Sequence, residues 1–270
     1  MNTDIKLSDK EVDSFLALIK VNKSINNIAF LDSIIAGIFH TIPFQNLTLL
    51  NTKKRPNIKQ IVKDMLLGIG GLCNTRNGFV YMLLKTLGFE VRFLSATMTQ
   101  ADCHIILLVC VNDEEYMVDT GNGFPYLSAI NLNESKVFSH PYMQHRVIKN
   151  NLHFYMQHKD AEDWKNNYHF SLETVTFSNF NTMLDKQYSE IGWGPFTTII
   201  LINKWSLDGG VIIRNKLCLA LNKNSETEKY PLKTLNDFKQ AAKRFFSDNG
   251  FVDLVDIDNT WRLINCENNN

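Results

Sequence analysis

Three side chains in the first half of the chain have the types needed for cysteine catalysis: Cys73, His104 and Asp119. This chemistry needs a thiolate, a base held beside it, and a group that fixes the tautomer of that base. Cys73 follows Gly70-Gly71 and precedes a helical pattern, so it is expected at a helix N-terminus. The helix dipole and unpaired N–H groups stabilise negative charge at such a position. The sequence therefore predicts Cys73 as the nucleophile, beside a glycine turn whose N–H groups could form an oxyanion hole.

The base and its orienting acid are expected on the two strands of one hairpin. His104 opens an apolar run, and Asp119 ends the next run, after a polar turn at 112–114. Because the start of one antiparallel strand lies beside the end of the next, the two side chains are expected to be cross-strand neighbours. Taken singly, each of the three residues also has an ordinary reading, as a packing cysteine, a satisfied histidine or a turn aspartate.

The elements that must position these residues change character along the chain. The first third predicts helices, the first of them after a capping box formed by Ser8 and Glu11. Further helices are expected over 32–39, over 58–68, and from Cys73 to a C-cap at Gly88. Strands then follow, and the last third mixes short strands with a closing helix that carries Leu235, Phe238, Ala242 and Phe245 on one face. The expected strands are 89–94, 104–111, 116–119, 153–157, 169–177, 196–202, 211–213 and 217–221.

Composition excludes several classes of protein. The 270 residues contain 28 Lys+Arg and 28 Asp+Glu, so no global field would recruit nucleic acid or an anionic membrane. No apolar run is long enough to span a bilayer, and the N-terminus lacks the apolar region of a signal peptide. A cytoplasmic protein is therefore expected. The five cysteines include no C-x-x-C pair and no nearby histidines at zinc-ligand spacing, so neither a disulfide scaffold nor a metal site is expected.

Three segments together resemble the arylamine N-acetyltransferase family. Residues 42–47, Ile-Pro-Phe-Gln-Asn-Leu, are similar to the family's I-P-F-E-N-L. Residues 70–79, with Cys73 and Asn77, are similar to its R-G-G-x-C-x-E-x-N-x-x-F segment. His104 with its apolar strand, followed by 116–123, resembles H-x-x-L-x-V and Y-x-V-D-V-G-F-G. The motifs occur in the family's order.

The resemblance implies an α+β fold of three lobes around a papain- or transglutaminase-like core. The lobes are expected as a helical bundle over 1–88, a β-barrel over 89–190 and a small α/β lid over 191–270. The implied reaction is ping-pong N-acetylation of arylamines or hydrazines, as in xenobiotic metabolism, through a thioacetyl group on Cys73. His104 would move protons and Asp119 would hold its tautomer. Acetyl-CoA is implied as a substrate, and no metal or tightly bound cofactor is implied.

The same resemblance assigns substrate binding to Phe44, Gly71, Leu72, Asn122 and Gly123, although a plain core role for Phe44 is an equal alternative. A cleft is expected between the helical and β lobes, reaching Cys73, with its mouth near 97–103. The sequence leaves the natural acceptor and the oligomeric state open.

Several positions depart from the family pattern. Ile69 and Thr75 stand where the family has Arg and Glu, and Gln45 stands for Glu. Asn122 replaces a Phe of the amine pocket, which favours a smaller or more polar acceptor. The segment before His104 is short and lacks the Pro-rich stretch that helps to seat the CoA arm. Two alternatives therefore stay open: an amide synthase or thiol hydrolase with the same three residues, and a non-catalytic ligand-binding relative.

Other charged and thiol groups near these motifs have two readings. Lys53-Lys54-Arg55 could meet CoA phosphates, or it could form a solvated loop. Arg76 is a candidate to restore a cation near the nucleophile. Cys103 is expected to point to the strand face opposite His104, in a structural role.

Overall fold

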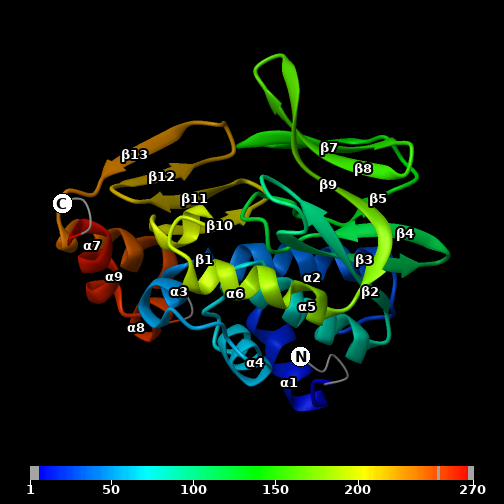
Figure 1. Cartoon of the computed structure of the whole chain (residues 1–270), viewed down its shortest axis with the longest axis horizontal. Coiled ribbons are helices and arrows are strands. Elements are labelled where there is room, and N and C mark those ends of the chain that lie inside the picture. Colours follow the sequence, from blue (N-terminus) through cyan, green and yellow to red (C-terminus); the bar gives the residue numbers. More distant parts are fainter. Residues whose placement is uncertain (1–5, 248–249, 267–270) are drawn as a thin grey trace.

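The structure is a computed structural model, and it describes residues 6–247 and 250–266. Helices from the N-terminal part lie together below two β-sheets, and helices from the C-terminal part flank the smaller sheet (Figure 1). Five helices precede the first long strand: α1 (Asp9–Leu18), α2 (Ile28–Thr41), α3 (Leu47–Thr52), α4 (Ile58–Leu66) and α5 (Cys73–Leu87).

Local capping signals set the limits of the first helices. The capping box expected at α1 is present, with the Ser8 side chain and the Glu11 side chain each bonded to the other's backbone N–H. α2 is longer than expected at both ends. It begins earlier because Asn27 caps it by accepting a hydrogen bond from Phe30 N–H, and it continues to Thr41 before the C-cap at Ile42. α5 ends at Gly88, which has φ 92° as a C-cap.

The larger sheet has eight antiparallel strands in the order β5-β4-β3-β2-β9-β8-β7-β6. The predicted barrel is present as this curled sheet, in which β5 and β6 form the two edges. Its central strand β3 is buried along almost its whole length, as expected for a strand covered on both faces, and α5 packs against β2 and β3. The bounds are β2 (Glu90–Thr97), β3 (His104–Val111), β4 (Glu114–Val118), β5 (Ile130–Asn131), β6 (Val137–His140), β7 (Met143–Asn150), β8 (His153–Asp160) and β9 (Asp163–Val175).

The smaller sheet combines one short strand from the N-terminal helical part with four strands from the last third of the chain. Its order is β1-β10-β11-β12-β13, so that β1 (Phe44–Gln45), from among the N-terminal helices, pairs with β10 (Leu201–Ser206). The division into lobes at residues 88 and 190 stays a prediction. β1 belongs to the predicted helical lobe by sequence, but it pairs with a strand of the predicted lid lobe. The remaining strands are β11 (Gly209–Arg214), β12 (Leu217–Leu221) and β13 (Thr227–Pro231).

The strand expected over 196–202 begins later than predicted. Pro195 starts a short 3-10 helix, η2 (Pro195–Thr197), and β10 follows from Leu201. The C-terminal helices are α7 (Leu235–Phe246), α8 (Phe251–Leu254) and α9 (Ile257–Cys266). Two further helical segments, η1 (Phe177–Phe180) and α6 (Asn181–Ser189), follow β9.

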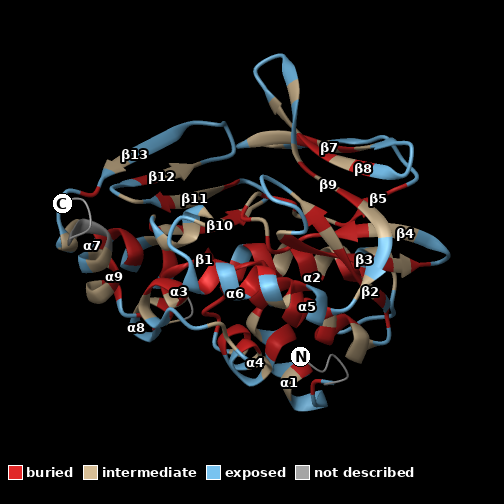
Figure 2. Cartoon of the chain, in the orientation of Figure 1, coloured by how far each residue is buried: buried red, intermediate tan, exposed pale blue. Residues whose placement is uncertain are grey.

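One apolar core runs continuously beneath both sheets (Figure 2). It includes side chains of α2, α5 and β3, and also Ile202 and Trp205 of the smaller sheet. Among the described residues, no helix combines the length and the apolar character that crossing a membrane requires.

Candidate active site

Cys73 is the first residue of α5, directly after a glycine turn. Leu72 is the N-cap in an extended conformation and makes no side-chain capping bond. The first N–H groups of the helix therefore have no partner in the N-cap side chain. Gly70 has φ 72°, and a Cβ there would lie 1.9 Å from the carbonyl oxygen of Pro43. Only glycine fits this position, because the left-handed conformation and the close backbone approach both exclude a side chain. The turn thus places the Cys73 thiol, which is 6% exposed, at the edge of the core.

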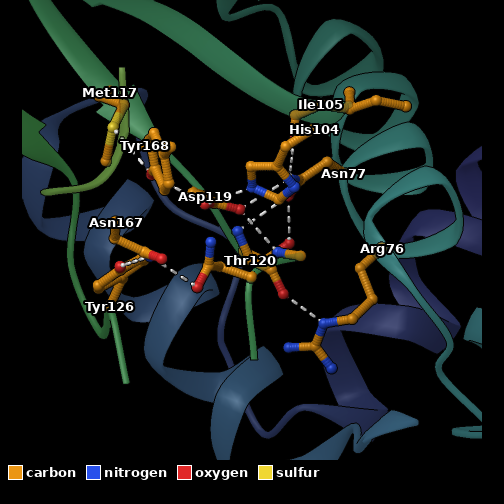
Figure 3. Close-up of polar contacts among 12 residues, drawn as sticks. Arg76, Asn77, His104, Ile105, Met117, Asp119, Thr120, Tyr126, Asn167 and Tyr168 are labelled. Atoms are coloured by element: carbon orange, nitrogen blue, oxygen red, sulfur yellow. Dashed lines mark hydrogen bonds and ion pairs between the residues drawn. The ribbon is translucent and has the colours of Figure 1, made fainter. Parts of the chain in front are cut away.

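His104 and Asp119 are joined by the expected hydrogen bond. His104 Nε2 lies 2.8 Å from Asp119 Oδ2, and both side chains are buried (Figure 3). The two residues are cross-strand neighbours, as predicted, in a diagonal arrangement. Leu107 pairs with Val118, so the same register places Asp119 opposite Ile106. His104 lies two residues from Ile106 on the same strand face, within reach of a diagonal contact.

The Asp119 carboxylate accepts hydrogen bonds from four donors. Oδ2 accepts from His104 and also from the hydroxyl of Tyr168 at 2.9 Å. Oδ1 accepts from Asn77 Nδ2 and from the backbone N–H of Gly121, each at 3.0 Å. These donors come from α5, β3, β9 and the loop after β4, so several elements fix the carboxylate (Figure 3).

Asn77 links α5 to the loop that carries Asp119. Its Nδ2 also donates to Ile105 O at 2.6 Å, while its Oδ1 accepts from the backbone N–H and the hydroxyl of Thr120 at 2.9 and 2.8 Å. Since Asn77 lies one turn after Cys73, it sets the distance between α5 and the Asp119 loop.

Electrostatics favour an ionised pair. Burial alone would lower the pKa of His104, but the charge of Asp119, its hydrogen bond and a hydrogen bond with Cys73 raise it to about 10. Burial alone would raise the pKa of Asp119, but His104, Asn77 and Gly121 hold it below its usual range. The arrangement therefore keeps an imidazolium beside the thiol at neutral pH. Because Nε2 faces Asp119, Nδ1 is the nitrogen left for Cys73.

Arg76 is fully buried, and its guanidinium is hydrogen-bonded to main-chain carbonyl groups. Its Nη1 donates to Ile42 O at 2.5 Å, its Nε donates to Thr120 O, and its guanidinium lies 5.2 Å from the centroid of the Phe39 ring. Burial lowers its pKa to about 9, against the opposing effect of Asp119. Arg76 thus ties α5 to the main chain before β1 and after β4.

A cavity of about 390 Å³ lies against the smaller sheet and the loop after β4, and its lining does not include Cys73, His104 or Asp119. Of the five residues that stay predicted to bind substrate, Phe44, Asn122 and Gly123 line this cavity, whereas Gly71 and Leu72 do not. Gly71 instead bridges to Phe44 through the backbone, and Leu72 is buried as the N-cap. The other lining residues are Phe124, Tyr142, Pro195, Phe196, Ile199, Leu201, Asn203, Trp205, Ile212, Arg214, Leu217 and Leu219.

Two short segments connect the wall of this cavity to Cys73. Phe44 is bridged to Gly71, two residues before Cys73. Gly121 packs so tightly on Cys73 that a Cβ on the glycine would lie 2.6 Å from Cys73 Cα. Two residues later, Gly123 is held by a hydrogen bond of 2.8 Å from Trp205 Nε1 to its carbonyl oxygen.

The mouth of the substrate cleft was expected near residues 97–103, but none of these residues lines this cavity. Strands β10 to β12 of the smaller sheet form much of the cavity wall instead. Asp102 borders a separate polar cavity of about 280 Å³, together with Ser95, Ser171 and Glu173.

The basic run at 53–55 is only partly solvated. Lys53 and Lys54 are exposed, whereas Arg55 donates to Asn181 Oδ1 at 2.7 Å and to Asp185.

Sequence reasoning missed Tyr168, Asn203, Trp205 and Arg214. Tyr168 is 49 residues from Asp119 along the chain, and no local pattern marks it. Asn203 lies in a strand that was expected to end at 202, so its inward position could not be assigned. Two amide atoms in the cavity wall, Asn122 Nδ2 and Asn203 Oδ1, are buried without a hydrogen-bond partner.

Comparisons with known proteins agree on one family. A family model described as N-acetyltransferase matches residues 27–248. An uncharacterized acetyltransferase of Bacillus subtilis (strain 168), YvcN, is 26% identical over 231 residues, which span 78% of this chain and 88% of that protein. The arylamine N-acetyltransferase of Escherichia coli (strain K12) is 29% identical over 142 residues, 49% of this chain and 50% of that enzyme.

Solved structures share the fold at low identity. The arylamine N-acetyltransferase from Salmonella typhimurium superposes with a TM-score of 0.84 at 18% identity, covering 97% of this chain and 100% of that one. The Mycobacterium marinum arylamine N-acetyltransferase in complex with CoA superposes with a TM-score of 0.82 at 18% identity, covering 94% and 98%.

Proposed function

The chain belongs to the arylamine N-acetyltransferase family, and we propose that it moves the acetyl group of acetyl-CoA to an aromatic amine or hydrazine through an acetylated Cys73. The observation that carries this proposal is the buried His104–Asp119 hydrogen bond of 2.8 Å beside a cysteine at a helix start. The aromatic cavity whose wall is connected to Cys73 through Phe44 and the loop with Gly121 has the size and lining suited to a small planar acceptor. A relative of the same fold was solved with CoA, which supports acetyl-CoA as the donor.

In the first half-reaction the Cys73 thiolate attacks the thioester carbonyl of acetyl-CoA. The backbone N–H of Cys73, at the free helix start, is a candidate donor to the oxyanion that forms. Collapse of the tetrahedral intermediate breaks the bond to the CoA sulfur. The His104 imidazolium gives its proton to that sulfur, so CoA leaves as a thiol and a thioacetyl enzyme with neutral His104 remains.

In the second half-reaction the amine nitrogen attacks the thioacetyl carbonyl. His104 now takes a proton from the nitrogen, and the Cys73 sulfur leaves as a thiolate when the N-acetylated product forms. The imidazolium and thiolate are thereby restored. Asp119 keeps its charge throughout and holds the imidazole so that Nδ1 faces the sulfur.

Intact-mass measurement tests the proposal. Incubation with acetyl-CoA should add the mass of one acetyl group, a peptide map should place it on Cys73, and an aromatic amine should remove it. Cys73→Ala should abolish the addition, whereas Cys103→Ala, which changes a half-buried thiol outside the site, should not. Absence of the mass shift at saturating donor would refute the proposal, and loss of the acetyl group to water alone would indicate a thiol hydrolase.

Asp119→Asn separates orientation from folding. The amide would favour the wrong imidazole tautomer, so acetyl transfer should fall by roughly 10⁴-fold while circular dichroism stays unchanged. A folded variant with a near-normal rate would remove Asp119 from the mechanism.

A further inference from the structure

Three histidines on neighbouring strands of the larger sheet form a cluster separate from His104. His140 lies on β6, His145 on β7 and His158 on β8, and His145 pairs directly with His158 across the two strands. In the part of the chain that the structure describes, no carboxylate lies within ion-pair distance of these three rings. Burial therefore keeps all three neutral near pH 7.

His158 is the member of the cluster that reaches the loop after β4. Its Nε2 is in hydrogen-bond contact with the Tyr126 hydroxyl, and the Phe124 ring meets the imidazole edge-on with the centroids 4.5 Å apart. Asn167 Nδ2 donates to the Tyr126 oxygen at 2.9 Å (Figure 3) and also lies 3.4 Å from His158 Nε2. Because an amide N–H group faces Nε2, we assign this nitrogen as an acceptor and place the ring proton on Nδ1. The Tyr126 hydroxyl then donates to His158.

One short loop is thus held at both ends by a histidine. Asp119 at its start is bonded to His104, and Tyr126, seven residues later, is bonded to His158. Tyr126 is 1% exposed, so its hydroxyl needs a partner in the interior. Between the two ends, Gly121 packs directly against the backbone of Cys73. A shift of this loop would therefore be felt by both Asp119 and Cys73.

The two histidines need opposite protonation states. Asp119 keeps the His104 ring charged, whereas His158 must be neutral to accept a proton from Tyr126. Burial lowers the pKa of His158 to about 4, and burial with the charge of Asp119 raises the pKa of Tyr126, so the donor and the acceptor both persist at neutral pH.

The other groups that face His158 do not favour its charged form. His145 lies opposite it on β7, and burial together with the neighbouring imidazoles lowers the pKa of His145 to about 3. Lys165 lies opposite it on β9 and is paired with Asp160, two residues along β8. The hydrogen bond from Tyr126 is therefore present at neutral pH and is lost as pH falls through about 4.

We propose that His158 is a positioning residue which, as the neutral acceptor for Tyr126, fixes the far end of the loop that carries Asp119. This inference rests on the proposed function, because the loop matters through the bond between Asp119 and His104. His158 acts only through Tyr126 and the backbone of the loop. When it gains a proton, the loop loosens, and the orientation of His104 beside Cys73 loosens with it.

Nitrogen-15 NMR of the imidazole rings tests the contact in the wild type. His158 should show the Nδ1–H tautomer and should stay neutral between about pH 5.5 and about pH 8, where an unperturbed histidine titrates near 6.5. This measurement needs no substitution.

The rate of Cys73 alkylation by iodoacetamide, read by peptide mass, tests the consequence. Each variant is compared over the pH range in which circular dichroism shows it folded. His158→Phe and Tyr126→Phe should each slow alkylation about fivefold at pH 7, because one buried hydrogen bond is lost. The double variant should be no slower than either single variant, since both remove the same bond.

His158→Gln restores an acceptor that does not titrate. Its rate at pH 7 should exceed that of His158→Phe, and the ratio of its rates at about pH 4 and pH 7 should exceed the wild-type ratio about fivefold. His153→Gln is the matched control and should follow the wild-type profile. His153 is an exposed histidine of the same strand, and its ring lies against His169.

Three results would overturn the inference: an Nε2–H tautomer for His158, a wild-type alkylation rate in His158→Phe, or the wild-type pH profile in His158→Gln. If His158→Phe does not fold, the tautomer and the His158→Gln profile still decide. Failure of the proposed function gives a different result. No acetyl group would then pass from acetyl-CoA to Cys73, yet the tautomer and the alkylation rates would still establish what His158 does.

Discussion

Asp119 shows at the scale of single residues how a buried charge is kept. Its carboxylate has little contact with water but accepts four hydrogen bonds, and each of these favours the ionised form. Tyr168 is the contributor that no motif indicated. Its hydroxyl shares Oδ2 with His104, and the centroid of its ring lies 5.3 Å from that of the imidazole, so Tyr168 is a positioning residue for His104.

Tyr168→Phe removes one of these four donors and keeps the ring. We expect kcat to fall about tenfold with KM for the amine unchanged, because the orientation of His104 loosens while the cavity stays intact. The pKa of Asp119 should rise, so the acid limb of the rate profile should move to higher pH. Tyr155→Phe is the control, since the Tyr155 hydroxyl has no hydrogen bond among the described contacts. An unchanged profile would show that the Tyr168 hydroxyl only fills space.

The His104–Asp119 pair should also appear in the pH dependence of stability. The pKa of His104 is raised in the folded state, so its contribution is fully present below the unfolded value near 6.5 and is lost as pH rises through about 10. The pKa of Asp119 is lowered, so its contribution is lost in acid. Thermal melts should show Tm falling between about pH 6.5 and about pH 10 in the wild type. His104→Gln should flatten this fall, and an equal fall in both proteins would contradict the pairing.

At the scale of elements, the turn before α5 decides where Cys73 lies. Gly70 holds a left-handed conformation against Pro43 O, and Gly121 lets the loop after β4 approach the backbone of Cys73. The helix start, the strand β1 and the loop with Asp119 therefore meet within a few residues. Ile69 and Thr75, which stand where the family has a charged pair, are both buried beside this turn.

Gly70→Ala should destabilise the protein by about 3 kcal/mol, because the new Cβ meets a backbone oxygen in a conformation that disfavours it. Activity should fall as the Cys73 turn shifts. Urea unfolding measures the first effect and the rate of thioacetyl formation the second. Gly194→Ala is the matched control, since it has no atom within 4 Å of its added Cβ and an extended φ of −152°. Equal stability of the two variants would contradict the strain at Gly70.

At the scale of the whole molecule, Asn46 joins the N-terminal helices to the smaller sheet. Its Nδ2 donates to Phe196 O at 2.7 Å and to Ile199 O at 2.6 Å, and its Oδ1 accepts from Leu201 N–H at 2.8 Å. The side chain is fully buried. The asparagine of the I-P-F-Q-N-L segment is thus a joint between parts of the chain about 150 residues apart.

Asn46→Ala should lower the free energy of unfolding by about 3 kcal/mol or more, because three main-chain groups lose their partner in the interior. The KM for the amine should rise as well, since Phe196, Ile199 and Leu201 line the cavity. Asn150→Ala is the control, as Asn150 is exposed and its side chain makes no hydrogen bond among the described contacts. A change below about 0.5 kcal/mol would exclude the joint.

Local signals in the sequence determined the elements that carry the chemistry. The capping box of α1, the glycine turn before Cys73, the C-cap at Gly88 and the bounds of β3 were all predicted, because each depends on residues within one or two turns of chain. The order of the motifs was enough to indicate the family.

Only the tertiary structure decided how distant segments meet. The strands β6 and β7 are polar and partly exposed, so no alternation marked them, and β10 was placed too early because Pro195 begins a 3-10 turn. The contact of Tyr168 with Asp119 and the position of Arg214 at the cavity rim follow from sheet register. Register depends on pairing between residues far apart in the chain, and a single sequence carries no local record of such pairing.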